Sequence, residues 1–154
     1  ASNTKCVPMK QGQCVADTMT PLLIRSILYK NKDGTDTVKH YYGRQYNQMG
    51  MGKDICKNIC LKNNKNVSIY GTQYSEECFC GNKLDKDAYI ASDTNCNNNC
   101  LYNTKEKCGG AWHSNVYMIK KTNELTLEKL FEILRTETTE YIEEKEEIDE
   151  NENI

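Results

Sequence analysis

The chain has 154 residues with nine cysteines, and its formal net charge at pH 7 is −2. Its mean hydropathy is −0.78, which predicts a thin apolar core, and no apolar run approaches the roughly 20 residues of a membrane-spanning helix. We therefore expect no membrane span in this chain. The length suits one domain with appended segments. No signal peptide precedes Ala1, so for a secreted protein this would be a mature or trimmed chain.

The two charge signs are segregated along the chain. Residues 1–123 carry 17 Lys and Arg against 10 Asp and Glu, a net charge of +7, whereas residues 124–154 carry 3 against 12, a net charge of −9. Blocks of like charge are typical of solvated interaction tails. We expect either self-association or a basic partner for the acidic tail, with an inert spacer as the alternative.

Eight cysteines follow one ordered frame of spacings. They are Cys14, Cys56, Cys60, Cys78, Cys80, Cys96, Cys100 and Cys108. Such density is typical of extracellular modules in which disulfides compensate for a small core. Zinc is the rival interpretation, but its sites usually use C-x2-C spacing and histidine, whereas these pairs are separated by three residues or one. We therefore expect four intrachain disulfides, no metal, and a secreted or cell-surface location.

The chain begins with an expected N-terminal arm over residues 1–13, in which Cys6 lies outside the frame and is predicted to be the odd thiol. The apolar run at residues 22–29 predicts a strand. The Asp33-Gly34 pair that follows it predicts a tight hairpin turn. A second strand is expected to return through residues 37–42.

A helix is predicted between residues 52 and 63. Ile55 and Ile59, and beside them Cys56 and Cys60, repeat at a spacing of four residues, which places two apolar side chains and two thiols on neighbouring faces of a helix. Such a helix would be held by disulfides as well as by packing.

Strands are predicted at residues 67–74 and 77–81. Cys78 and Cys80 would project from the same side of the second strand, because side chains alternate along a strand. They would also be nearly parallel, which excludes a disulfide between the two. The polar segment 82–107 is expected to be loop and short helix, and residues 116–119 to form a closing strand.

The C-terminal segment is predicted to contain an amphipathic helix over residues 125–134, followed by an acidic tail. Leu127, Leu130, Phe131 and Leu134 repeat at helical spacing. We expect this stripe to be buried against the domain or against another chain, because exposed large apolar side chains favour association.

These motifs resemble the WSC domain, the eight-cysteine module of fungal wall-stress sensors. The strongest matches are the run from Tyr70 to Asn82, which contains Cys78-Phe79-Cys80-Gly81, and Cys108-Gly109-Gly110 with the following Val116-Tyr117. Met51 and Asp54 also lie at the family's positions before the C-x3-C pair, and Asp17 follows Cys14 at the family's spacing. Val15 replaces the usual aromatic residue, and Cys6 has no counterpart.

The resemblance implies a PAN/apple-like α+β fold, in which a short antiparallel sheet packs on one helix, and a carbohydrate-binding role. It would place a WSC-like domain at residues 14–119 and the helix and acidic tail at residues 120–154.

No catalytic constellation is recognisable in the sequence. His40 and His113 lack a nucleophile motif, and carboxylates are abundant only in the tail, which cannot hold two of them rigidly as a glycosidase requires. We expect no enzyme activity, no cofactor and no nucleic-acid binding.

Aromatic side chains are the best candidates for binding, since tyrosine offers a sugar ring both an apolar face and a hydroxyl group. The candidate ligand-binding residues are Tyr70, Tyr74, Tyr89, Trp112, His113 and Asn82. The alternative is that Tyr70, Tyr117 and Trp112 are core residues. The Asn66-Val67-Ser68 sequon predicts a glycan on Asn66.

The leading hypothesis is an extracellular lectin-like or adhesion module that binds a polysaccharide or glycoprotein. The alternative is a protein–protein interaction module, a subunit of a cell-surface complex or extracellular fibre assembled through Cys6 and the C-terminal helix.

Overall fold

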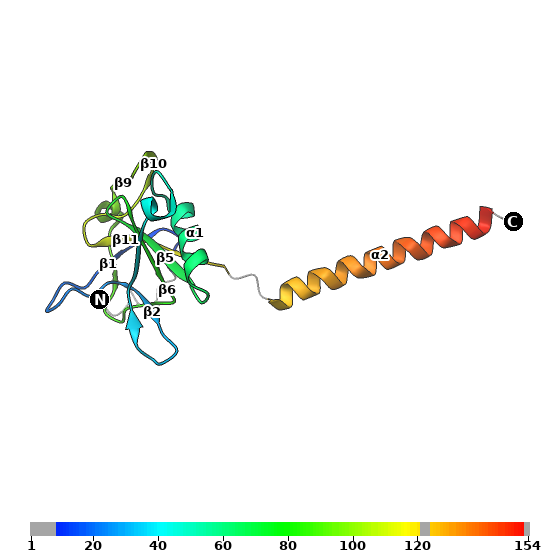
Figure 1. The fold of residues 1–154 in the computed structure, drawn as a ribbon, viewed down its shortest axis with the longest axis horizontal. Helices are drawn as coiled ribbons and strands as arrows, with labels where there is room; N and C mark the ends of the chain where they lie inside the picture. The colour runs from blue at the N-terminus through cyan, green and yellow to red at the C-terminus, as the bar shows by residue number, and fades with distance from the viewer. Residues whose placement is uncertain (1–8, 121–123, 153–154) are drawn as a thin grey trace. The chain divides into compact units, whose positions relative to one another are not determined.

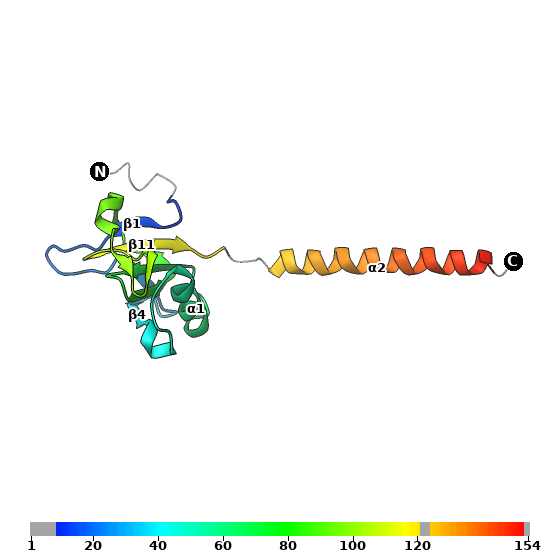
Figure 2. The same ribbon diagram turned by 90° about the horizontal axis from the view of Figure 1, so that it is seen from above.

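The computed structural model describes residues 9–120 and 124–152, with side chains in the second range only for residues 129–146. The chain divides into two compact units, at Ala1–Ile119 and Lys120–Ile154. Figures 1 and 2 show the first as a sheet-rich module with one short α-helix, and the second as a single long helix. The predicted Cys6 thiol lies outside the described residues.

A six-stranded antiparallel sheet organises the first unit. In order across the sheet, its strands are β4 (Lys39–Tyr42), β6 (Glu77–Gly81), β5 (Ile69–Gln73), β11 (His113–Met118), β1 (Gln13–Ala16) and β8 (Tyr89–Ile90). The central hairpin of β5 and β6 pairs over its full length, from Ile69 opposite Gly81 to Gln73 opposite Glu77.

Smaller elements surround this sheet. They are β2 (Ile27–Lys30), β3 (Asp36–Thr37) and β7 (Lys83–Leu84) in a three-stranded sheet, β9 (Asn99–Cys100) and β10 (Asn103–Lys107) in a hairpin, α1 (Lys53–Asn63), and the 3-10 helices η2 (Gly43–Tyr46) and η3 (Asp93–Cys96). Strand β2 crosses close to the main sheet. A Cβ atom on Gly71 or Gly81 would collide there with Ile27 or Leu28.

Helix α1 covers one face of the main sheet and is joined to it by two disulfides. Cys78 and Cys80 alternate with their neighbours along β6, so both face α1, where they bond Cys56 and Cys60 respectively. The predicted absence of a Cys78–Cys80 bond is confirmed. The buried residues between α1 and the sheet form one core cluster: Met51, Cys56, Ile59, Cys60, Val67, Tyr70, Cys78, Cys80, Cys100 and Cys108.

The opposite face of the sheet carries a second core cluster, made of Val15, Ile27, Ile69, Phe79 and Val116. Alternation explains this arrangement, because Phe79 stands between the two cysteines of β6 and must project away from α1. The remaining disulfides, Cys14–Cys96 and Cys100–Cys108, anchor η3 to β1 and close the β9–β10 hairpin. The eight cysteines of the frame are thus paired, and the α+β, disulfide-rich class predicted from the sequence is confirmed.

Several predicted boundaries were wrong. The first apolar strand begins only at Ile27, because Leu22 and Leu23 lie in an exposed loop. The expected returning strand is divided: β3 pairs with β2, whereas β4 leaves to pair with β6. Segment 82–107, expected to lack strands, contains four short ones, since crosslinks and tertiary pairing stabilise polar sequence that has little intrinsic strand preference.

The second unit is helix α2 (Glu124–Glu152). It is longer than the predicted helix at residues 125–134 and includes the acidic segment that was expected to be a tail. Leu130, Phe131 and Leu134 each expose at least half of their surface, while the side chain of Leu127 lies outside the described ones. The expected burial of this stripe against a partner stays a prediction.

Candidate ligand-binding site

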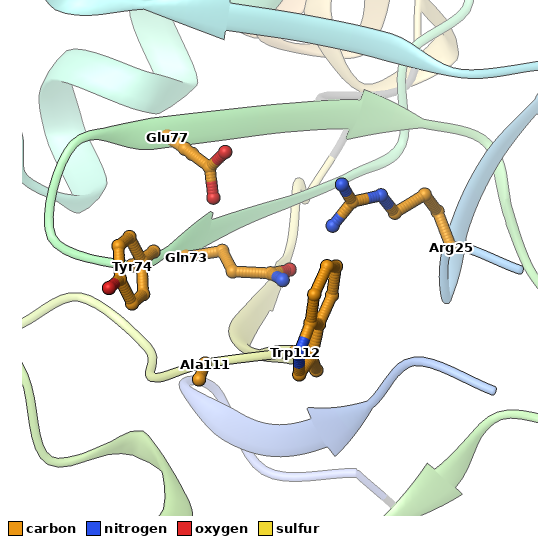
Figure 3. A pocket seen from close by; sticks show the side chains of 6 residues that line it. All are labelled: Arg25, Gln73, Tyr74, Glu77, Ala111 and Trp112. Carbon is orange, nitrogen blue, oxygen red and sulfur yellow. The ribbon is translucent and has the colours of Figure 1, made fainter. Parts of the chain in front are cut away.

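A hollow of about 230 Å³ lies at the turn end of the β5–β6 hairpin, with Arg25, Gln73, Tyr74, Glu77, Ala111 and Trp112 lining it. Figure 3 shows Glu77 and Arg25 pointing into the space from one side, Trp112 on the other, and Tyr74 at one end. Glu77 precedes Cys78, which bonds α1, so its side chain projects from the opposite sheet face. Gln73 pairs directly with Glu77 and shares that face. The hollow therefore combines two aromatic rings with two opposite charges.

The buried Asp17 carboxylate fixes the polar floor of the hollow. Asp17 Oδ2 accepts hydrogen bonds from Arg25 Nη1 and Gln73 Nε2, both at 3.2 Å, and Asp17 Oδ1 accepts one from the Ser26 backbone N–H at 2.7 Å. Gln73 Oε1 in turn accepts a hydrogen bond from the Ser114 hydroxyl at 2.6 Å. Asp17 is only 3% exposed. Its carboxylate balances the charge of Arg25, and the charged hydrogen bond between them fixes the position of the guanidinium.

Arg25 also contacts two aromatic rings. Its guanidinium carbon lies 5.3 Å from the centroid of the Trp112 ring and 5.1 Å from that of Phe79. The imidazole of His40 stacks on the Phe79 ring, with the ring centroids 4.3 Å apart and an interplanar angle of 8°. Cation–π contacts of this kind favour a planar guanidinium over an ammonium. The stack orients the Trp112 ring while leaving 42% of that residue exposed.

Glu77 is the carboxylate that the hollow leaves available. Burial raises its pKa, an effect that Arg25 partly offsets. The Glu77 carboxylate lies 3.2 Å from His40 Nε2, but burial and the Arg25 charge lower the pKa of His40, so the imidazole is neutral at neutral pH and does not neutralise Glu77. Glu77 can therefore accept hydrogen bonds from a ligand's hydroxyl groups.

Both aromatic residues of the hollow have left-handed backbone conformations, with φ of 49° at Tyr74 and 59° at Trp112. Such conformations are uncommon outside glycine and cluster at functional sites. The Trp112 loop is fixed where the Asp17 N–H donates to the Trp112 carbonyl at 2.9 Å.

Of the six predicted binding residues, the structure brings Tyr74 and Trp112 together at the hollow. Tyr70 is 5% exposed and stacks on Tyr117 at 5.1 Å; burial raises the pKa of Tyr70 to about 12. Its ring is therefore in the core, as the alternative interpretation had it, and offers no face to a ligand. Trp112, in contrast, is not a core residue.

The other three predicted residues lie elsewhere. Tyr89 is exposed on β8 but is not among the residues that line the hollow. His113 Nδ1 lies 2.7 Å from the Ala111 carbonyl oxygen. Asn82 exchanges two hydrogen bonds with the backbone of Lys30, at 2.8 and 3.3 Å, which gives its side chain a structural role between β2 and β6.

Sequence reasoning missed Arg25, Gln73 and Glu77. The latter two lie inside the run Tyr70–Asn82 that carried the resemblance, so they could have been found by asking which of its polar residues share a strand face with Phe79. Arg25 gave no signal, since it sits alone beside an apolar run. Asn66, the predicted glycosylation site, is exposed in the turn after α1, and its modification stays a prediction.

The fold and the hollow define a class: a small, disulfide-crosslinked α+β module with an aromatic-lined hollow at one end of its sheet. The comparisons identify the family, because the model of the WSC domain matches residues 29–110, more than half of the chain. The chain belongs to the WSC domain family, and the resemblance found in the sequence is confirmed. WSC domains are in general carbohydrate-binding modules of extracellular and cell-surface proteins.

Known relatives match over this module. Xylosyltransferase oxt of Drosophila melanogaster is 40% identical over 62 residues, which are 40% of this chain and 7% of the relative. The enzyme of the same name from Drosophila pseudoobscura pseudoobscura is 38% identical over 64 residues, and a WSC domain-containing protein of Arthroderma benhamiae is 39% identical over 64; each match covers 42% of this chain and 7% of the relative. The chain thus spans a small part of each relative. Among the described residues, no helix is long and apolar enough to cross a membrane.

Proposed function

We propose that this chain binds a neutral carbohydrate in the hollow between Trp112 and Tyr74, and that it does so without catalysing its cleavage. The observation that carries this proposal is the half-exposed Trp112 ring, oriented by its contact with Arg25 at the wall of the hollow. A flat indole face excludes water over the apolar face of a sugar ring, and the polar groups beside it select the ring's hydroxyls.

The charge balance of the hollow favours neutral sugars over acidic ones. Arg25 is paired with Asp17, and His40, the basic group within 4.0 Å of Glu77 among the described residues, is neutral. A uronate or sulfate would therefore meet the negative charge of Glu77, which is only partly offset by Arg25. A neutral sugar can instead donate hydroxyl hydrogens to Glu77 and accept hydrogen bonds from the free N–H groups of Arg25.

Titration calorimetry with neutral and uronic-acid oligosaccharides tests this function. Replacing Trp112 by Ala should weaken binding of the neutral sugar by about 1–3 kcal/mol, the cost found for aromatic stacking on nucleobases, and Trp112→Phe should retain part of it. Tyr89→Ala is the matched control, because it removes an exposed aromatic ring outside the hollow. Salt should change the affinity little, because a neutral sugar forms no ion pair with the protein that salt could screen.

Two outcomes would contradict the proposal. One is binding confined to acidic glycans, abolished by salt and unaffected by Trp112→Ala, which would indicate nonspecific attraction to the basic first unit. The other is loss of the folded state in Trp112→Ala, which thermal unfolding would reveal and which would show that Trp112 serves the stability of the fold. Steady release of reducing sugar from any of the oligosaccharides would show that the chain cleaves its ligand and would contradict the proposal of binding without catalysis.

A second candidate function is assembly through α2. The observation that favours it is the exposure of Leu130, Phe131 and Leu134 within one turn and a half of that helix. Burying each of these side chains would contribute about 1.5–3 kcal/mol, and the net charge of −9 beyond residue 123 favours a basic partner over a second α2 helix. This candidate is compatible with carbohydrate binding by the first unit.

A further inference from the structure

A second hollow adjoins the first across the turn between β5 and β6. It has a volume of about 310 Å³. Tyr42, Arg44, Glu76 and Tyr102 are among the residues that line it. Tyr74 in the turn and Glu77 at the start of β6 line the first hollow, whereas Glu76 lines the second. Residues at this turn therefore line both hollows.

Residues from the walls of the two hollows meet on one face of the sheet. Tyr42 on β4 lies opposite Glu77 on β6, and His40 lies opposite Phe79, so all four side chains project from the face that α1 does not cover. The Tyr42 hydroxyl donates to Glu77 Oε1 at 3.5 Å, which joins a wall of the second hollow to a wall of the first.

A series of side-chain contacts links residues that line the two hollows. From Trp112 it runs through Arg25, Phe79 and His40, then to the Tyr42 ring at 4.9 Å from His40, and to Arg44, whose guanidinium carbon is 4.8 Å from the Tyr42 centroid. The first two members line the first hollow and the last two line the second.

The chemistry of the second hollow repeats that of the first. Tyr102 is 80% exposed and presents an aromatic ring, while Arg44 and Glu76 supply one donor group and one acceptor group of opposite charge. Its geometry is fixed by the turn, because the Ser75 N–H donates to the Cys108 carbonyl at 2.9 Å and the Leu101 N–H donates to the Ser75 carbonyl at 3.0 Å. The Cys100–Cys108 disulfide braces the same hairpin. A rigid pair of hollows loses little entropy when one ligand fills both.

We propose that the two hollows are subsites of one groove, and that the ligand is an extended chain of neutral sugar units that crosses the β5–β6 turn. This inference rests on the proposed function of the first hollow and extends it from one sugar unit to an oligosaccharide. Trp112 and Tyr102 are the aromatic platforms at its two ends.

Calorimetry with linear oligosaccharides of glucose, xylose and mannose, each from the disaccharide upward, tests the groove. Affinity should rise with chain length until both subsites are filled. Tyr102→Ala should lower the affinity for the long oligosaccharide by roughly tenfold, the equivalent of one stacked ring, and leave the disaccharide affinity unchanged. Trp112→Ala should lower both, and Tyr89→Ala should lower neither.

The outcomes separate the two proposals. Affinity that is independent of length, with Tyr102→Ala behaving like Tyr89→Ala, overturns the groove and leaves the function of the first hollow standing. Disaccharide binding that is insensitive to Trp112→Ala overturns the function itself, and so does a wild-type chain that binds none of the oligosaccharides. Because Tyr102 is so exposed, its replacement should leave the thermal unfolding of the chain unchanged, which the same samples report.

Discussion

Buried polar side chains hold the residues of the site in place. Asp17 is buried with three hydrogen bonds to its carboxylate. His40 stacks on Phe79, and burial and the nearby Arg25 charge lower its pKa and keep it neutral. Removing one partner from such a set leaves a buried polar group unsatisfied, which costs more than the net value of the contact. The residues that position Arg25 are therefore as important to the site as those that line it.

Acidification should destabilise the first unit through His40. Its pKa is lowered below the ordinary 6.5 by burial and by Arg25, so the unfolded chain binds this proton first. The stability that neutral His40 contributes is present above pH 6.5 and is lost as the pH falls through the lowered pKa. We expect the Tm to fall as the pH drops below about 6.5, and to fall less steeply in His40→Gln, as measured by thermal unfolding over a pH series.

Glu77 provides an internal control of opposite sign. Burial raises its pKa above 4.5, so its contribution to stability is present below that value and is lost as the pH rises through the raised pKa. Removing it in Glu77→Gln should therefore steepen the fall in Tm on acidification.

The His40 prediction has its own contradicting outcome. Identical pH profiles for wild type and His40→Gln would show that His40 does not titrate differently in the folded and unfolded states.

Among the elements, α1 and β6 form the crosslinked centre of the first unit. Their two disulfides join cysteines one helical turn apart on α1 to alternate residues on β6. This places α1 against one face of the sheet, and it leaves Glu77 and Phe79 for the other face, where the site is built. The helix thus supports the site without touching it.

Removing one of these crosslinks should cost more than removing the one in the β9–β10 hairpin. We expect the double variant Cys60→Ala/Cys80→Ala to lose about 2–5 kcal/mol of unfolding free energy in a denaturant titration. The comparison variant is Cys100→Ala/Cys108→Ala, whose bond spans 8 residues instead of 20; the shorter loop gains less from closure. Equal losses in the two variants would contradict a special role for the α1–β6 crosslink.

On the scale of the whole molecule, the chain combines a basic module with an acidic helix. The two units separate between Ile119 and Lys120, and both proposed sugar subsites lie within the first. A helix of 29 residues with 12 acidic side chains gains little from its own propensity, since most helical stability in proteins comes from packing an apolar face. Truncation of the chain before α2 tests what this helix contributes.

Truncation to residues 1–119 should leave the Tm of the first unit within about 1 °C, because removing exposed segments has little effect on an independent core, and should leave its oligosaccharide affinity unchanged. Analytical ultracentrifugation of the full chain, alone and with a basic amphipathic peptide at two salt concentrations, measures association through α2. We expect the intact chain to bind the peptide at low salt and the truncated chain not to bind it. Equal behaviour of the two chains would indicate that α2 is an inert spacer.

Local sequence patterns were enough to predict the elements that carry pairs of disulfide cysteines. The spacing of Cys56 and Cys60 predicted α1, and the alternation of Cys78 and Cys80 predicted both β6 and the face that its thiols share. These inferences were reliable because helix and strand periods are intrinsic to the backbone. Short pairings such as β3 with β2 and β9 with β10 could not be read in the same way, because polar residues form strands there only when a partner strand is supplied.

The sequence by itself determined the family, the disulfide-rich class and the presence of an aromatic candidate at Trp112. Only the tertiary structure decided that Tyr70 is core, that Tyr89 is remote from the hollow, and that Arg25, Asp17 and Glu77 converge on it. Arg25 and Trp112 are far apart in the chain and meet because β2 crosses the face of the main sheet. Such a contact is set by how the sheets pack, and no periodicity within one segment reports it.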